Sequence, residues 1–214
     1  MSMNLFLKIR NVLYHGLVAA TLFRWLSRVG INIVPYYLFV ESNDLSTTGN
    51  LKPILEKPYE ILVLDRNQVD LIKGLENLPR MESEFTKLWD KGCFCVCLIS
   101  DGSVLGYGWF DLTRCNYKYL PFELKDDEAY SFNFYTVRHM RGRNIAPFLR
   151  NYLAVHVQSL GRTRRYSITE LFNTPAMKFK DKRKAKPHSL YIYINLWARF
   201  GKNIKIKTMK DNQS

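Results

Sequence analysis

Residues 129–161 read AYSFNFYTVRHMRGRNIAPFLRNYLAVHVQSLG and contain three patterns in succession. Largely apolar, aromatic residues over Ala129–Val137 predict a strand, and apolar residues at helical spacing between Asn144 and Gly161 predict a helix. The residues between them, RHMRGRN, carry three arginines and a glycine. A strand that runs through a short loop into an apolar helix indicates a sheet with a helix packed on it.

The loop between this strand and this helix has the features of an anion site. The first backbone N–H groups of a helix have no internal acceptors and lie at the positive end of the helix dipole. Gly142 allows close approach of a ligand, Asn144 can cap the helix in left-handed geometry, and Ala146 keeps the first turn thin. Three arginines add positive charge there, namely Arg138, Arg141 and Arg143. The alternative is a capped helix with solvated arginines.

The remaining patterns extend the sheet on both sides of this stretch. Tyr59–Asp65 reads as a strand, Asp65 or Asn67 can cap a short helix around Val69, and residues 83–92 read as a second helix that ends at Gly92. The runs CFCVCLI and VLGYGWFDL form a hairpin through Asp101-Gly102. Downstream lie a strand at 165–171, a helix opened by NTPAMKFKDKRK and a strand HSLYIYINLW. The order predicts a mixed α+β fold with helices on both faces of the sheet.

The segment Arg141-Gly142-Arg143-Asn144-Ile145-Ala146 resembles the pyrophosphate loop of GNAT acetyltransferases, Arg/Gln-x-x-Gly-x-Gly/Ala. The likeness covers about Lys52 to Lys207 and includes the hairpin, the strand end FYTV and the later NTPA. It implies a mostly antiparallel central sheet and direct transfer of an acyl group from acetyl-CoA, or another acyl-CoA, to an amine. The residues it assigns to the cofactor are Tyr135, Thr136, Val137, Arg138, Arg141, Gly142, Arg143, Asn144, Ile145, Ala146, Asn173 and Ala176.

The same resemblance implies a base that removes a proton from the amine, and Glu170 is the acidic residue between Arg138 and Lys180. It is equally an ordinary surface carboxylate. Asn133 and Tyr135 are two positions apart on one predicted strand, so they are expected to share a face and to contact acceptor or thioester, or to be plain sheet residues. Lys180 stands where many family members have a tyrosine that protonates the departing thiolate.

The charge distribution leaves three functional hypotheses open. The net charge is +13, and residues 138–214 hold 18 Lys/Arg against 3 Asp/Glu, whereas residues 1–137 hold 14 against 16. A basic third of this kind indicates a polyanionic partner. The first hypothesis is the acyltransferase, and the second is a basic nucleic-acid-binding module. The third is a GNAT scaffold that binds CoA without catalysis, which the missing tyrosine at Lys180 suggests. Because no nucleic-acid motif is present, we expect a small amine and no nucleic acid as the partner.

Residues 1–50 form a predicted N-terminal extension, with amphipathic helices over 1–30 and a short extended element broken by Pro35; residues 51–214 form the acyltransferase domain. The apolar run over Gly16–Phe23 is too short to span a bilayer. The protein is therefore expected in the cytoplasm, where the helices either pack on the domain or rest on the inner face of the membrane. The combination of an N-terminal amphipathic segment, the stretch YYLFVESNDL and a core that ends in the strand LYIYINLW is similar to GNAT-like proteins of bacterial surface-polysaccharide synthesis. This resemblance implies an amino-sugar acceptor.

Three cysteines at alternate positions, Cys93, Cys95 and Cys97, are expected to form a stripe on one strand, with Cys115 elsewhere. A single strand does not surround a tetrahedral ion, and no CxxC or HxxxH pair completes a ligand set. The prediction is four small buried thiols in a reducing compartment, and no metal.

Overall fold

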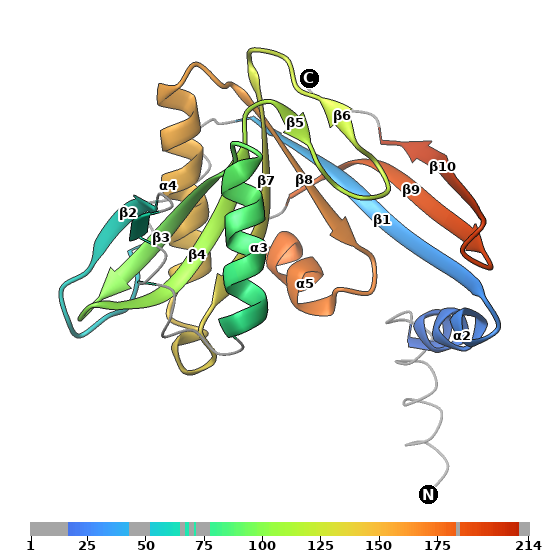
Figure 1. Cartoon of the computed structure of the whole chain (residues 1–214), viewed down its shortest axis with the longest axis horizontal. Helices are drawn as coiled ribbons and strands as arrows, with labels where there is room; N and C mark the ends of the chain where they lie inside the picture. Colours follow the sequence, from blue (N-terminus) through green and yellow to red (C-terminus); the bar gives the residue numbers. More distant parts are fainter. Residues whose placement is uncertain are drawn as a thin grey trace, which may run out of the picture. The chain divides into compact units, whose positions relative to one another are not determined.

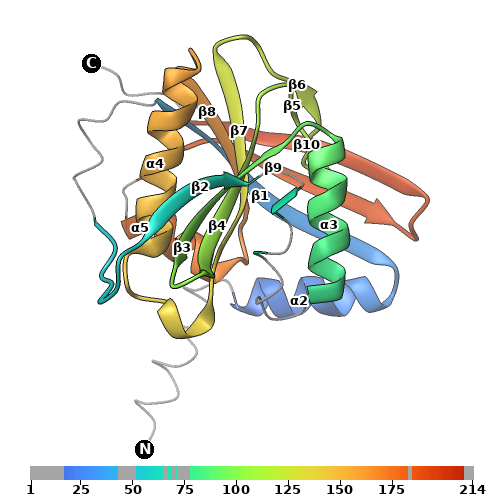
Figure 2. The same cartoon turned by 60° about the vertical axis from the view of Figure 1, so that its left-hand side comes forward.

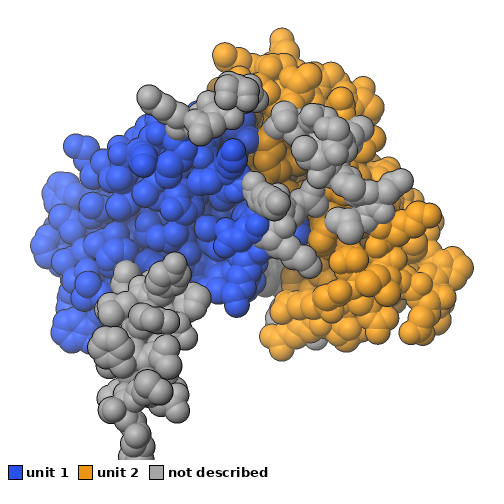
Figure 3. All heavy atoms as spheres, turned by 180° about the vertical axis from the view of Figure 1, so that it is seen from behind, with its two compact units in different colours: residues 1–40, 117–120, 168–214 blue, residues 41–116, 121–167 orange. Residues whose placement is uncertain are grey.

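The computed structural model describes residues 17–42, 52–64, 67–68, 71, 78–182 and 185–209. The chain divides into two compact units, coloured blue and orange in Figure 3: residues 1–40, 117–120 and 168–214 form the first unit, and residues 41–116 and 121–167 form the second. The start of the N-terminal segment, the connector at 43–51 and most of the short helix predicted around Val69 lie outside the described residues.

Eight strands follow one hydrogen-bonded order, β10-β9-β1-β8-β7-β4-β3-β2. The described pairings are antiparallel except that of β7 with β8, which is parallel. This large, mostly antiparallel sheet with helices confirms the predicted α+β class. Within the described ranges no helix is both long and apolar enough to cross a membrane.

In the second unit the strands are β2 (Glu60–Leu64), β3 (Phe94–Ser100), β4 (Ser103–Asp111), β7 (Glu128–Thr136) and the start of β8 (Arg164–Glu170), with a small hairpin of β5 (Arg114–Cys115) and β6 (Phe122–Glu123). The predicted β3–β4 hairpin is confirmed. Ser100 pairs with Ser103 across Asp101 and Gly102, whose φ angles are 54° and 69°. Left-handed geometry at both residues is that of a type I′ turn, which suits an Asp-Gly pair.

Two helices cover opposite faces of these strands (Figures 1 and 2). Phe85 of α3 (Leu78–Asp90) packs with Cys95, Cys97 and Trp109, whereas Leu149 of α4 (Ile145–Ser159) packs with the alternate strand residues, such as Val96 and Leu98. The strand alternation therefore supplies two apolar cores, one under each helix.

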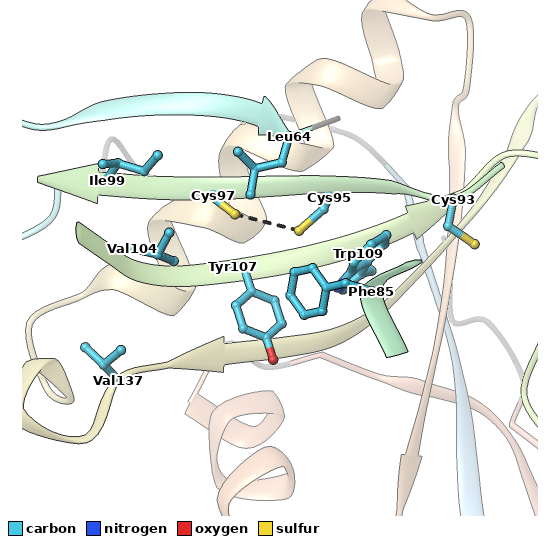
Figure 4. Packing of buried hydrophobic residues seen from close by; sticks show 10 residues of the cluster. All are labelled: Leu64, Phe85, Cys93, Cys95, Cys97, Ile99, Val104, Tyr107, Trp109 and Val137. Carbon is cyan, nitrogen blue, oxygen red and sulfur yellow. Dashed lines mark hydrogen bonds between the residues drawn. The ribbon is translucent and has the colours of Figure 1, made fainter. Parts of the chain in front are cut away.

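The cysteine stripe lies in the core under α3 (Figure 4). All four cysteines are buried and free, as predicted, and the sulfurs of Cys95 and Cys97 are 3.7 Å apart. Among the described residues, no group of three or more His, Cys, Asp or Glu is arranged to hold a metal ion. The absence of a metal from this protein remains a prediction.

The first unit contains α2 (Leu17–Arg28), β1 (Ile31–Ser42), α5 (Thr174–Lys182), β9 (Pro187–Leu196) and β10 (Phe200–Thr208). The prediction that Pro35 breaks its segment is wrong, because β1 runs through it. The Pro35 carbonyl accepts the Leu171 N–H at 2.9 Å and therefore points away from β9. Because the N–H and C=O groups of one strand residue point to the same side, the N–H that proline lacks is not needed for the pairing with β9. The strand β10 was not predicted.

Candidate functional site

A bulge in β7 shapes the second unit where the sequence predicts the site. Phe132 pairs with Trp109 and Tyr135 pairs with Tyr107, so two β7 residues, Asn133 and Phe134, lie opposite Gly108 of β4. Asn133 has a φ of 49°, the left-handed geometry of an irregular strand residue. A Cβ on Gly108 would lie 2.4 Å from the Phe134 ring, so only glycine accommodates that ring there.

The bulge changes which β7 residues share a face. Phe132 and Tyr135 both pack against the core under α3, whereas Phe134 packs against the core under α4. Residues three apart therefore share a face, and the two-residue alternation that paired Asn133 with Tyr135 does not hold across the bulge. Asn133 is exposed, and Tyr135 is half-buried with its ring 5.4 Å from that of Tyr107.

After the bulge the chain keeps its pairing with β4 until Val137, whose N–H donates to the Leu105 carbonyl at 3.0 Å. A single 3-10 turn follows, η3 (Arg138–Met140). The Nε of Arg141 donates to the Thr136 carbonyl at 3.3 Å and folds the loop back on the strand end. The hydroxyl oxygen of Thr136 is buried and has no hydrogen-bond partner among the described residues.

The loop then enters α4 with its backbone N–H groups unsatisfied. Gly142 and Asn144 have φ angles of 83° and 59°, and the first helical bond runs from the Phe148 N–H to the Asn144 carbonyl at 3.1 Å. Among the described residues, no acceptor meets the N–H groups of residues 142–146. Asn144 occupies the predicted N-cap position, but its side chain makes no capping bond in this left-handed geometry. These donors remain available to an anion.

The packing of α4 holds this row of donors near the ends of β4 and β7. A Cβ on Gly106 would lie 2.8 Å from Cγ2 of Ile145 and 2.9 Å from the Tyr135 carbonyl oxygen, so glycine permits the close approach. The Arg143 carbonyl accepts the Ile54 N–H at 2.9 Å, which fixes the loop from the other side. The donors are therefore held in one arrangement before any ligand arrives.

Charge and space at the loop suit a diphosphate. Arg138 and Arg141 are exposed, Arg143 is half-buried, and residues 137–147 contain no acidic residue. A Cβ added at Gly142 would meet no atom within 4 Å. Backbone donors, fixed positive charge and open space are together what an anionic phosphate group requires.

Glu170, the predicted base, is exposed at the end of β8 in the first unit and accepts a hydrogen bond from the Tyr117 hydroxyl at 3.1 Å. Tyr117 is half-buried, with Tyr36 and Tyr119 edge-on at 5.0 and 5.4 Å. Burial, followed by the negative charge of Glu170, raises the pKa of Tyr117, so the hydroxyl stays protonated and donates. Tyr117 was not predicted, because it precedes Glu170 by 53 residues and no motif joins them.

The other predicted residues of the first unit lie on α5 or directly before it. The side-chain oxygen of Asn173 accepts the Ala176 N–H at 3.3 Å and caps this helix. Lys180 is only 4% exposed, and its ammonium lies 4.3 Å from the centroid of the Phe39 ring. The residue at the tyrosine position of the resemblance is thus a buried lysine.

Comparisons with solved structures identify the fold. The chain is similar to a tandem GNAT protein from the clavulanic acid biosynthesis pathway, with a TM-score of 0.54, 10% identity and coverage of 83% of this chain and 55% of that one. It is also similar to a GNAT-family acetyltransferase from Colwellia psychrerythraea, with a TM-score of 0.54, 15% identity and coverage of 78% and 57%. A conserved protein of unknown function from Staphylococcus epidermidis gives a TM-score of 0.56 at 8% identity, with coverage of 82% and 66%.

The chain therefore has a GNAT-like fold, and its structural neighbours include GNAT acetyltransferases at low identity. It spans between about half and two thirds of the length of these three structures. No protein-family model and no curated protein matches the sequence.

Proposed function

We propose that this chain is an acyl-CoA-dependent N-acyltransferase, with acetyl-CoA as the co-substrate, which passes the acyl group directly to an amine in a ternary complex. The observation that carries the proposal is the row of unsatisfied N–H groups at residues 142–146, between a bulged strand and a helix N-terminus. Such donors bind a diphosphate. The GNAT-like fold supports the same assignment.

In this proposal the second unit holds the co-substrate. Residues 141–146 bind the diphosphate, and Arg138 adds charge. Tyr135, Thr136 and Val137 form the end of the bulged strand, and we assign this strand end to the pantetheine arm and to polarisation of the thioester carbonyl. The Val137 N–H is not one of the donors, because it already donates to the Leu105 carbonyl. The unpaired Thr136 hydroxyl is a further donor at the same strand end.

The acceptor chemistry rests on Glu170. A neutral amine forms the new N–C bond as the C–S bond breaks, and Glu170 takes the proton that the amine releases, directly or through water. CoA leaves as a thiolate and takes up a proton from water. The donated bond from Tyr117 keeps the Glu170 carboxylate oriented as an acceptor. Two further assignments rest on the sequence resemblance. It assigns Asn173 and Ala176 to the cofactor, and Asn133 and Tyr135 to the acceptor or the thioester.

The proposed acceptor is a small amine, in particular the amino group of a nucleotide-linked or lipid-linked sugar. Surface-polysaccharide synthesis and a cytoplasmic location at the inner face of the membrane belong to the same proposal. We also propose that residues 1–50 form an N-terminal extension and that residues 51–214 form the acyltransferase domain.

A second candidate is a CoA-binding scaffold without catalysis. It is favoured by Lys180, which replaces the tyrosine expected in the family and lies buried against Phe39. Because the scaffold predicts the same co-substrate binding, thiol release separates the two. The scaffold binds acetyl-CoA and releases no thiol with any amine, whereas the enzyme releases CoA thiol with its acceptor. The buried cysteines give this thiol measurement a low background.

The binding test is a thermal shift with Gly142 variants. At 100 times its dissociation constant a ligand stabilises a fold by about 2.7 kcal/mol, so acetyl-CoA should raise the wild-type Tm by about 5–10 °C. Gly142→Asp puts negative charge beside the row of donors and should abolish this shift.

Gly142→Asn is the matched control, because asparagine has the size of aspartate and both tolerate the left-handed backbone of residue 142. It should keep at least half of the shift. An unmoved wild-type Tm, or equal shifts in the two variants, would show that the loop is a helix start and nothing more. A single-stranded oligonucleotide of equal charge should leave the Tm unchanged; a shift with it would favour the nucleic-acid hypothesis.

A further inference from the structure

An apolar stripe on α2 faces away from the body of the first unit. Leu22, Trp25 and Val29, on and just after this helix, are 53%, 63% and 51% exposed, and their spacing of three and four residues puts them on one helical face. Phe23, by contrast, is half-buried and packs edge-on against Phe172 at 5.6 Å. The helix is thus attached through one side and presents large apolar side chains on another.

The β9–β10 turn adds two more exposed aromatic rings beside this stripe. Trp197 and Phe200 are 64% and 69% exposed. The Trp197 N–H donates to the Gly30 carbonyl at 2.7 Å, and a Cβ on Gly30 would lie 2.5 Å from the Trp197 ring. Figures 1 and 2 both show the turn beside the end of α2. The stripe and the turn therefore form one apolar surface, called here the tryptophan surface: Leu22, Trp25, Val29, Trp197 and Phe200.

The backbone under Trp197 is costly, which indicates that the ring has a use. Trp197 and Ala198 have φ angles of 47° and 55°, a type I′ geometry that glycine and asparagine adopt readily and bulky residues avoid. A tryptophan here exposes a large ring at the tip of a turn and gives up backbone stability. Strain of this kind clusters at functional positions.

The two chain segments that carry the tryptophan surface are basic and contain no acidic residue. Residues 17–40 and 185–209 hold seven Lys/Arg and no Asp or Glu. Exposed members on α2 and the β10 hairpin are Arg24, Arg28, Arg199, Lys202, Lys205 and Lys207. A surface that joins indole rings to several basic side chains is complementary to a bilayer interface rich in anionic lipid, where tryptophan lies at headgroup depth.

We propose that the tryptophan surface docks the protein on an anionic phospholipid bilayer, with α2 lying along the interface and the β9–β10 turn inserted beside it. The contact is peripheral, since α2 has 12 residues and a bilayer-spanning helix needs about 20. A protein partner would fit the exposed rings, but the basic side chains of the two segments favour lipid headgroups. This inference assigns a surface to the membrane location proposed above, and its test does not require acyl transfer.

The experiment is co-sedimentation of the full chain with vesicles. Binding is expected to vesicles of equal parts phosphatidylcholine and phosphatidylserine, and at least tenfold weaker binding to pure phosphatidylcholine. The double variant Trp25→Ala/Trp197→Gly should lose binding to the mixed vesicles. Glycine at residue 197 relieves the left-handed backbone, so a folding defect is not expected; the acetyl-CoA thermal shift, or circular dichroism if none is found, checks the fold. Ile54→Ser, which removes an exposed apolar side chain from the second unit, is the matched control and should bind like wild type.

Charge reversal supplies the second arm. Each basic residue near an anionic membrane is worth about a fivefold change in affinity, so Arg28→Glu/Arg199→Glu should bind at least about thirtyfold more weakly. Lys87→Glu/Lys91→Glu makes the same change of charge on exposed positions of the second unit and should have little effect. Equal binding to both vesicle types, no binding, or full binding by the double tryptophan variant overturns the proposal. So does self-association that depends on Trp25 and Trp197, which would make the surface a protein interface.

Discussion

At the scale of single residues, the bond from Tyr117 to Glu170 makes a specific prediction about catalysis. Tyr117→Phe removes the donor and keeps the ring between Tyr36 and Tyr119. The unpartnered carboxylate should lose its fixed orientation, so kcat should fall about tenfold, while the acetyl-CoA thermal shift should stay unchanged. Thiol release under saturating acceptor measures the first quantity.

Tyr193→Phe is the control for this substitution. The Tyr193 ring stacks on Tyr119 at 4.1 Å and its hydroxyl accepts from Asn195 at 3.2 Å, so the variant removes a hydroxyl from the same aromatic cluster without changing Glu170. Equal rates in the two variants would assign Tyr117 a purely structural role.

The thiol of Cys93 predicts how stability depends on alkaline pH. Burial and the neighbouring Asp111 raise the pKa of Cys93 from 9.0 to about 12. In the unfolded chain this thiol loses its proton near pH 9, whereas in the folded chain it keeps the proton to about pH 12. The stability that the protonated thiol contributes is therefore complete below pH 9 and is lost as the pH rises through this window.

We accordingly expect the Tm to fall between pH 9 and pH 11, and to fall less steeply in Cys93→Ala, which carries no ionisable group at that position. Tyr166, whose pKa burial raises to about 12, supplies part of the remaining slope in both proteins. Identical pH profiles for the variant and wild type would exclude a contribution from Cys93.

At the scale of elements, the bulge in β7 depends on a glycine in the neighbouring strand. Gly108→Ala would bring a methyl group within 2.4–2.7 Å of the Phe134 ring, and overpacking of this kind costs about 1–3 kcal/mol. Residue 108 has an ordinary strand φ, so backbone strain plays no part. Urea denaturation should show this loss, and Phe134→Leu in the same chain should recover part of it, because the smaller side chain makes room. Additive losses would mean that the ring does not limit residue 108.

Elements with strong local patterns were predictable from the sequence, and elements fixed by distant partners were not. The β3–β4 hairpin has its Asp-Gly turn and α4 has its helical apolar spacing, so local physics determines both. The length of β1 depends on the missing N–H of Pro35 lying on the side of the strand that does not pair with β9. The strand β10 reads FGKNIKIKT, which is a polar edge strand that pairs with β9. The bulge at Asn133–Phe134 depends on the pairing of β7 with β4, so no local sequence pattern located it.

At the scale of the whole molecule, the basic side chains of the C-terminal third lie in several different environments. Arg150 and Arg165 are buried and both contact the carboxylate of Glu41, at 2.5 and 2.7 Å, so one of their two positive charges is compensated within the second unit. Lys180 is buried in the first unit. Linear charge counts predicted one polyanionic partner, because sequence order does not reveal which cations are paired or buried. Part of the remaining exposed charge lies in the loop at 138–143, and another part lies on the segments that carry the tryptophan surface.

This division predicts that the two proposed contacts respond differently to salt. Near 1 M NaCl the Debye length is about 3 Å, so basic side chains spread around the tryptophan surface no longer attract a charged membrane, and vesicle binding should be lost. Backbone donors at residues 142–146 act by direct hydrogen bonds, which salt screens far less, so most of the acetyl-CoA thermal shift should persist. The variants should separate in the same way: Gly142→Asp should abolish the shift and keep vesicle binding, and Trp25→Ala/Trp197→Gly should do the reverse. If one substitution removes both activities, or if salt removes them in parallel, a single basic surface serves both ligands and the division is wrong.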